Sequence, residues 1–356
     1  MDRRDFLVAS GSAVMAGAGL SGPLHQAFAT PLPADRTRQM TLTVADAGNA
    51  SWTTGQAREL ARRIEQASSG GYAVSVASPA SGTASALNVV SAAQLVERDA
   101  AFAFATGLPG SAALDAEAVD TWLTTAGGQS ALDELAASHG LKVLLAGHGG
   151  EAFLWSAKPL HTAADFAGKC VQAEGLACYV AAGLGAEPWR IVPGTAPGGL
   201  TSGAVAAIEA TVPDAIHRGI VPAARYASAN ALAPRGTAVA LTLELDVWRA
   251  MTPADRAVMS SAAQESYRDS IRINRLGTDL HRHALQHTCA IDVSPVPHGL
   301  AAQIQTVARA VVAQTAAISP FAAKLNASYM SFLKSQQDLP TRGPAVSAFH
   351  PASVLL

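Results

Sequence analysis

The sequence predicts a mixed α/β protein with two lobes and one long helix. Segments with strand-like alternation and segments with apolar residues at helical spacing follow one another along most of the chain. The strand-like segments fall into two clusters, which favours two lobes over one continuous sheet. Once an N-terminal leader is removed, roughly 325 residues remain, enough for two sizeable cores.

The first cluster has the strand–helix repetition typical of parallel βαβ units. Its predicted elements are a strand at 40–44, a helix at 55–67, a strand at 72–77, a helix near 87–97 and a short buried strand at 100–105. The second cluster has predicted strands at 141–145, 152–155, 169–172, 189–192 and 205–210, followed by strands at 238–245 and 293–296.

One helical pattern runs from about residue 253 to 287, and Pro253 suits its first turn. The predicted boundaries follow from these elements. They are lobe I at 38–145 plus 214–250, lobe II at 146–213 plus 290–298, a long helix at 253–288, C-terminal helices at 300–335 and a tail at 336–356.

The first 29 residues have the features of an export signal. Arg3 and Arg4 precede Phe6 and Leu7, a weakly apolar stretch follows, and the segment closes with small residues that end at Ala29. Paired arginines before such a stretch favour the twin-arginine (Tat) pathway. We therefore expect residues 1–29 to be a cleaved leader and the mature protein to lie in the periplasm.

Composition excludes several classes of partner and cofactor. The net charge is -2 and no Lys/Arg stripe occurs, which argues against nucleic acid and anionic membranes. Cys170, Cys178 and Cys289 are too few for a disulfide framework, a zinc site or an iron–sulfur cluster. We expect free thiols, although one pair has the opportunity to oxidise outside the cytoplasm.

Two glycine-rich stretches resemble parts of catalytic motifs. Gly147-His148-Gly149-Gly150 is similar to an esterase oxyanion loop, but the chain has no G-x-S-x-G elbow. Gly194 to Gly199 lacks the spacing and the Lys-Ser/Thr pair of a phosphate loop. A turn that lets the backbone approach a cleft explains the first stretch better.

Asp279, His283 and His287 follow one another four residues apart on the predicted long helix, with His281 nearby. Such spacing suits chelation of a transition metal. A solvated polar face explains the same residues, and we favour that interpretation. No organic cofactor is expected.

Short strings along nearly the whole mature chain resemble the DctP-type solute-binding proteins of TRAP transporters. The resemblance is closest to the 2-oxoacid subgroup, often labelled mannitol/chloroaromatic. The strings are Thr121-Trp122-Leu123 to Gly127-Gly128, Trp155 with Lys158-Pro159, Asp165-Phe166-Ala167-Gly168, Leu184-Gly185-Ala186-Glu187-Pro188, Ser202-Gly203-Ala204-Val205, Trp248 with Met251-Thr252-Pro253, and Ser328-Tyr329 with Phe332.

This resemblance implies a two-lobe, periplasmic-binding-protein-like clamp with a long bracing helix. Such a protein captures a small organic ligand, commonly an organic acid, in the cleft between its lobes and delivers it to TRAP membrane permease subunits. It catalyses nothing, reaches the membrane only through the permease, and is a monomer or a homodimer.

The resemblance also implies a ligand site, and this sequence departs from the family pattern there. Alignment through Gly168 and Gly175 places Gln172 where the family has a carboxylate-binding Arg. Glu151, four residues before Trp155, takes the position of a cation-binding Gln, and Glu209-Ala210 replaces a Glu-Trp pair. The implied ligand contacts are Glu151, Trp155, Gln172, Gly175, Glu209 and Ala210. Glu151 and Glu209 are also the expected ligands of Ca²⁺ or Na⁺.

Three interpretations of this altered site remain open. In the first, the alignment is shifted, and Arg190 or Arg218 binds the ligand carboxylate. In the second, the site has lost its function. In the third, the cleft has become more acidic. In the third case, Glu151 and Glu209 need a metal ion, a cationic or polyhydroxyl ligand, or a raised pKa. That case favours a neutral, zwitterionic or metal-bridged ligand over a bare monocarboxylate.

Two other functions are weighed against transport. One is a Tat-exported periplasmic enzyme, a hydrolase or a metal-dependent enzyme, that uses Glu151, Glu209 and the histidines. The other is a scavenging or sensory clamp without a permease.

Overall fold

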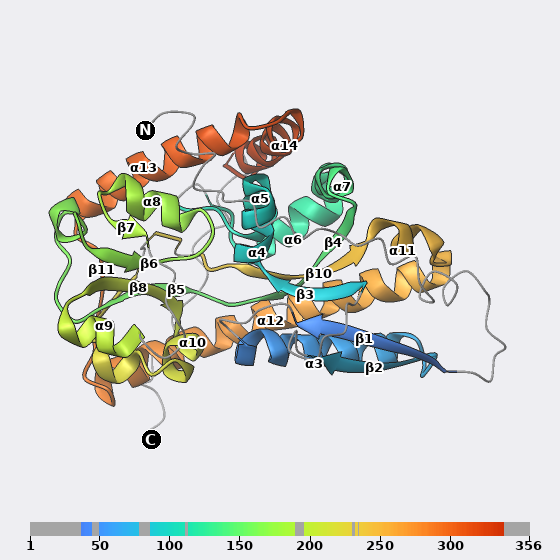
Figure 1. The fold of residues 1–356 in the computed structure, drawn as a ribbon, viewed down its shortest axis with the longest axis horizontal. Coiled ribbons are helices and arrows are strands. Elements are labelled where there is room, and N and C mark those ends of the chain that lie inside the picture. The colour runs from blue at the N-terminus through green and yellow to red at the C-terminus, as the bar shows by residue number, and fades with distance from the viewer. Residues whose placement is uncertain are drawn as a thin grey trace, which may run out of the picture.

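The computed structural model describes residues 37–44, 50–77, 86–110, 113–188, 196–229, 232–233 and 235–337. The leader at 1–29, Arg190 and nearly all of the predicted tail lie outside the described residues. Two β-sheets form the frame of the molecule, one at each end (Figure 1).

The first sheet combines parallel and antiparallel strands in the order β2-β1-β3-β10-β4. Its strands are β1 (Arg38–Val44), β2 (Tyr72–Ala77), β3 (Leu87–Ser91), β4 (Leu141–His148) and β10 (Ala238–Glu244). Helix α3 (Ala50–Ala67) covers this sheet with the fully buried side chains of Leu60 and Ile64. The apolar spacing that predicts this helix therefore also identifies the face that is buried.

The second sheet has the order β11-β9-β5-β8-β6-β7. Its strands are β5 (Ala152–Ser156), β6 (Cys170–Gln172), β7 (Glu187–Pro188), β8 (Val205–Thr211), β9 (Tyr226–Ala229) and β11 (Asp292–Pro295). Strand β9 pairs with β5 and β11. The assignment of residues 214–250 to lobe I is therefore wrong for β9, because backbone pairing ties this strand to the second sheet.

Two segments join the sheets, and they touch where they cross. One follows β4 at Gly149 and Gly150, and the other precedes β10 at Gly236 and Thr237. The Gly149 N–H donates to the Thr237 carbonyl at 3.0 Å. Gly236 has φ of +70°, and a Cβ there would lie 1.8 Å from the Gly150 oxygen. Only glycine fits at this crossing.

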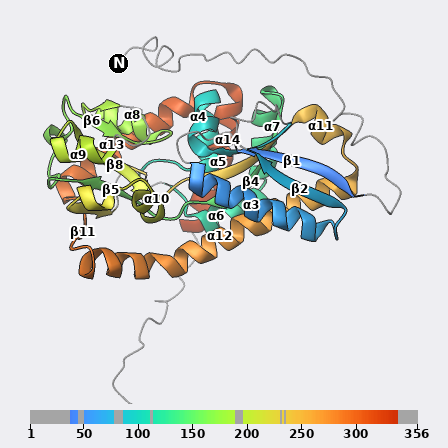
Figure 2. The same ribbon diagram turned by 60° about the horizontal axis from the view of Figure 1, so that its bottom comes forward.

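Helix α12 (Pro253–His287) confirms the predicted long helix. It begins with a capping box, in which Thr252 and Asp255 bond each other's backbone, and Pro253 occupies its first turn. Figure 2 shows it running beneath both lobes. Met259 packs in the core of the first sheet and Leu285 in the core behind the second. One rigid element thus anchors both lobes.

The other helices pack around the two sheets. They are α4 (Ala92–Arg98), α5 (Ala103–Thr106), α6 (Ala116–Thr125), α7 (Gly128–Ser138), α8 (Ala177–Gly183), α9 (Ala196–Ser202), α10 (Val212–His217), α11 (Leu245–Ala250), α13 (His298–Ala316) and α14 (Pro320–Gln337). Within the described residues, no helix has the length and apolar character needed to cross a bilayer.

Residues 87–106 differ from the prediction. The expected helix near 87–97 begins with strand β3, and the expected strand at 100–105 is a 3₁₀ turn (Ala100–Phe102) followed by α5. The side chains of residues 101–106 are buried throughout. Burial on every side removes the periodicity that separates a short helix from a short strand.

The three cysteines are free, as expected for isolated thiols. Cys289 is exposed, whereas Cys170 and Cys178 are partly buried. Burial raises the pKa of the Cys178 thiol to about 12, so this thiol is a weak nucleophile at neutral pH.

Candidate functional site

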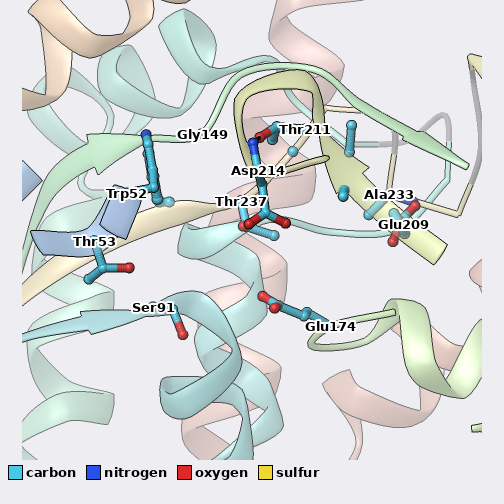
Figure 3. Close-up of a pocket in the computed structure, with 14 residues that line it drawn as sticks. Trp52, Thr53, Ser91, Gly149, Glu174, Glu209, Thr211, Asp214, Ala233 and Thr237 are labelled. Atoms are coloured by element: carbon cyan, nitrogen blue, oxygen red, sulfur yellow. Dashed lines mark hydrogen bonds between the residues drawn. The ribbon is translucent and has the colours of Figure 1, made fainter. Parts of the chain in front are cut away.

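A cleft of about 650 Å³, counting its open mouth, lies where the two sheets face each other (Figure 3). Both lobes line it. The first lobe contributes residues of α3 and the end of β3, and the second contributes residues of β8, α10 and the turn after β6. The crossing segments at Gly149 and at Gly236–Thr237 form part of its wall.

The first lobe presents neutral side chains to this cleft. Trp52 and Thr53 come from the first turn of α3, and Ser91 ends β3. Ser91 is fixed because it also caps α4 in a capping box with Gln94. This wall therefore offers the partly exposed indole of Trp52 and the Ser91 hydroxyl, while the Thr53 side chain beside them is fully buried.

The second lobe presents acidic side chains, of which Glu209 is the best defined. Its Oε1 accepts a hydrogen bond of 2.7 Å from the Ala233 N–H. Burial raises the pKa of the Glu209 carboxyl to about 7, and the nearby charge of Glu174 adds to that rise. Glu209 as a whole is only partly buried, because part of its surface faces the open cleft.

Glu174 and Asp214 complete the acidic wall. Glu174 lies in the turn after β6, just before Gly175, whose φ of +57° lets the chain turn into α8. Asp214 sits in α10, which is capped by Thr211, and pairs with Arg218 at 2.9 Å. The Arg218 guanidinium also donates to Gln172 Oε1. Among the described lining residues there is no Lys, Arg or His.

Strand register decides which predicted site residues meet. In the antiparallel β5–β8 pair, Glu209 lies opposite Leu154, and Ala210 lies opposite Phe153. Because side chains alternate between the faces of a sheet, Glu209 points to the cleft while its neighbour Ala210 points behind the sheet. Ala210 nevertheless also lines part of the cleft.

Trp155 lies behind the sheet. It is fully buried against Phe153, and its indole N–H donates to the Ala210 carbonyl at 3.0 Å. It holds β5 to β8 and does not line the cleft described above. Its role in the structure is therefore packing.

Glu151 also lies on this rear side. Both of its carboxylate oxygens accept hydrogen bonds from Nη2 of Arg282 on α12, at 2.6 and 2.8 Å. Arg282 in turn lies over the Phe153 ring, 5.7 Å from its centroid. The prediction that Glu151 and Glu209 hold one cation is wrong for this structure, because the two carboxylates face opposite sides of the sheet.

Gln172 and Gly175 lie beside the cleft on the β6 side. The Gln172 side chain is engaged by Arg218, and Gly175 shapes the turn that carries Glu174. Arg218, one of the two proposed carboxylate clamps, bonds Gln172 and Asp214 and is not among the residues that line the cleft. Arg190, the other proposed carboxylate clamp, lies outside the described residues.

Sequence reasoning missed Trp52, Thr53, Ser91, Glu174 and Asp214. Two signals were available for the acidic pair: Glu174 directly precedes the aligned Gly175, and Asp214 lies four residues before Arg218, at ion-pair spacing. No local signal marks the residues of the first lobe, since they reach the cleft only through the packing of α3 and β3.

The histidine-rich end of α12 does not build a metal centre. The His283 and His287 rings lie with centroids 4.4 Å apart, tilted by 45° relative to each other, and both residues are exposed. Across the part of the chain that the structure describes, no three His, Cys, Asp or Glu side chains gather closely enough to hold a metal ion.

The Gly147–Gly150 stretch forms the crossing between the lobes rather than an oxyanion hole. Its His148 is buried, and burial lowers the pKa of that imidazole to about 4. The His148 backbone is fixed to α12 at both ends, since its N–H donates to Ser270 Oγ at 2.8 Å and its carbonyl accepts from Asn274 at 2.6 Å.

Solved structures confirm the two-lobe α/β fold. A TRAP transporter solute-binding protein from Bordetella bronchiseptica aligns with a TM-score of 0.74 and 20% identity over 85% of this chain and 94% of its own. It is described as a mixed-occupancy dimer with copurified calcium and picolinate in one site. A periplasmic TRAP protein from Pseudoalteromonas atlantica with bound sodium and pyruvate aligns with a TM-score of 0.74 and 16% identity, over 85% and 95%.

A third relative, from Desulfovibrio desulfuricans, is described with bound sn-glycerol-3-phosphate. It aligns with a TM-score of 0.68 and 13% identity, over 83% of this chain and 97% of its own. No curated protein matches the chain. The family model of bacterial extracellular solute-binding proteins of family 7, DctP, matches residues 46–317. Since this match spans most of the sequence, the chain belongs to that family, whose members bind solutes rather than transform them.

Proposed function

We propose that this protein is the periplasmic solute-binding subunit of a TRAP transporter, which captures one small organic ligand and delivers it to the membrane permease subunits. The observation that carries the proposal is the cleft lined from both lobes. A ligand there contacts Trp52 and Ser91 on one side and Glu209 on the other. Binding then favours the arrangement in which both walls are close to the ligand.

The crossing segments provide the hinge for this closure. They are short, they contact each other at Gly150 and Gly236, and α12 holds the first of them through Asn274. Closure by rotation about a few residues at element ends is the usual mechanism in two-lobe binding proteins. The long helix then serves as the fixed brace under both lobes.

The leader supports export by the Tat pathway. A protein exported in this way folds before it crosses the membrane, with its thiols reduced, and it acquires any tightly bound ion in the cytoplasm. One relative is described as a dimer. Our proposal retains both a monomer and a homodimer for this chain, and sedimentation of the purified protein distinguishes them.

The ligand site does not match a cation-bridged anion built on Glu151 and Glu209. Relatives are described with calcium or sodium beside pyruvate or picolinate. Here Glu151 belongs to the rear face, and the acidic residues of the cleft, Glu174, Glu209 and Asp214, do not gather as an ion cage. A neutral or zwitterionic ligand fits this wall better than a bare monocarboxylate.

The test is a ligand-library thermal shift on the mature protein, with and without Ca²⁺. We expect saturable stabilisation by one compound, since a ligand that binds only the folded state raises its stability. Mass spectrometry of the released compound should show it unchanged. A library in which nothing stabilises the protein, or a compound that emerges altered, would overturn the proposal.

A further inference from the structure

A second cavity lies behind the segments that join the two lobes, and we call it the rear cavity. Its volume is about 1210 Å³, counting its open mouth. The first lobe, the second lobe and the long helix all contribute to its lining. The residues that matter below are Asp115 and Ala116 of α6, Glu151 just before β5, Gln305 of α13, and Ile271 and Thr278 of α12.

The crossing segments separate the rear cavity from the cleft. Gly149 and Gly236 line the cleft, whereas their neighbours Gly150 and Arg235 line the rear cavity. The partition between the two spaces is therefore little more than two backbone segments in contact. The cleft lies on one side of it and the rear cavity on the other.

The contacts of this partition suit a pivot. The N–H and the carbonyl of His148 are held by Ser270 and Asn274 of α12. The backbone of Gly236 lies directly against the Gly150 carbonyl. These contacts leave little room for the segments to slide, so the lobes rotate about the partition. In such a rotation the rear cavity widens as the cleft narrows.

We propose that the rear cavity sets the balance between the open and closed forms of the protein, so that side chains which do not touch the solute tune its affinity. This inference rests on the proposed function and names how the same site is regulated. The apparent affinity equals the intrinsic affinity multiplied by the fraction of molecules in the binding-competent form. Bulk that holds the rear walls apart raises that fraction.

The present contacts of the rear cavity oppose this movement only weakly. Two ion pairs join its walls to α12, Arg275 with Glu117 at 3.0 Å and Arg282 with Glu151 at 2.6 Å. The two arginine side chains are 77% and 41% exposed, so solvent screens both pairs and each contributes little to stability. The walls of an open cavity also lose few packing contacts when they separate.

The experiment measures the distance between the lobes of the mature protein by double electron–electron resonance, with no solute added. Nitroxide labels are attached to Arg58→Cys on α3 and Thr201→Cys on α9, two exposed positions. The native thiols Cys170, Cys178 and Cys289 are replaced by serine, so only the introduced thiols react. Helix α3 lines the cleft from the first lobe, and α9 lies beside α10 in the second (Figures 1 and 2), so this distance shortens when the cleft narrows.

The variants place a tryptophan either in the rear cavity or away from it. Ala116→Trp alters the first residue of α6, which lines the cavity, whereas Ala126→Trp alters an exposed residue just beyond the end of the same helix. We expect the first to raise the population of short distances about threefold and the second to leave it unchanged. Ile271→Trp and Ile273→Trp form an independent pair on α12, since Ile271 lines the cavity and Ile273 is 63% exposed. Glu151→Gln, which keeps the bulk of its wall, should not change the distances.

The outcomes separate the two proposals. Circular dichroism confirms that each variant folds. If the two rear-cavity variants fold and the distances stay unchanged or lengthen, or if the exposed controls shift them equally, the inference is overturned and the solute-binding role stands. Because no solute is present, these distances do not depend on the ligand library, and a silent library counts against the solute-binding role alone.

Discussion

Two glutamates of the second sheet, Glu151 and Glu209, show how strongly the face of a sheet determines the role of a side chain. Both belong to the antiparallel β5–β8 region, and both were expected at one site. Glu151 faces the long helix, where Arg282 neutralises it. Glu209 faces the cleft, where a backbone N–H holds it and no lining cation among the described residues neutralises it.

The same contrast extends to the aromatic side chains. Trp155 is fully buried behind the sheet and bonds the Ala210 carbonyl, whereas Trp52 is partly exposed at the cleft. On the rear face, the Glu151 carboxylate and the Trp155 indole N–H therefore both have partners within the protein. The cleft face leaves charge and aromatic surface available, at a cost in stability that a ligand can offset.

The largest effect on stability is expected from truncating Trp155 on the rear face of the sheet. Trp155→Ala removes a fully buried side chain and its hydrogen bond, so we expect the free energy of unfolding to fall by about 3–5 kcal/mol. The matched control is Trp52→Ala in the cleft, which should cost less than half as much and should weaken ligand binding. Urea denaturation measures both. Equal losses for the two variants would contradict the division between the faces.

A smaller, pH-dependent effect is expected at Glu209. Its pKa is about 7 in the folded protein, against an ordinary value of 4.5, so the folded state holds this proton more tightly. The tighter proton binding adds about 3 kcal/mol to the free energy of unfolding. This contribution is fully present below pH 4.5 and is lost as pH rises through 7.

Glu209→Gln should remove this pH dependence, because glutamine does not ionise. As pH rises from 4.5 to 7, the free energy of unfolding of the variant should therefore increase relative to that of the wild type. Buried His148, with its pKa lowered to about 4, titrates in the opposite sense in both proteins, and the difference between them cancels its contribution. Chemical denaturation across pH measures that difference. A difference that does not change with pH would show that the Glu209 carboxyl is well solvated.

The sequence predicted elements with strong periodicity and failed where periodicity vanishes. The long helix follows from apolar spacing and a cap that is local in sequence, and α3 follows from apolar spacing. Residues 101–106 are all buried, so the pattern of apolar residues there does not distinguish a helix from a strand. The placement of β9 in the second sheet depends on pairing with β5, which is distant along the chain.

For the site, the sequence named Glu209 as a candidate ligand contact, and this residue lines the cleft. An acidic cleft was one of three interpretations that the sequence left open. Adjacent residues in a strand point to opposite faces, so the sequence alone also predicts that the side chains of Glu209 and Ala210 lie on opposite faces of the sheet. The sequence does not predict the position of the Glu151 side chain. The face of the sheet on which it lies depends on the β5–β8 register and on Arg282, 131 positions away. Asp214 and Trp52 join the cleft only through the packing of whole helices.

The smallest effect is expected at the ion pair of Glu151 and Arg282, and it tests the comparison most directly. The Arg282 side chain is 41% exposed, so solvent screens the pair, and we expect a coupling of about 0.5–1 kcal/mol. A double-mutant cycle of Glu151→Gln and Arg282→Gln in urea denaturation measures this coupling, and high salt should reduce it. Neither variant should change ligand affinity. If Glu151→Gln instead abolished binding while the coupling stayed near zero, this carboxylate would have to turn to the cleft when ligand binds, and the two glutamates would share one site after all.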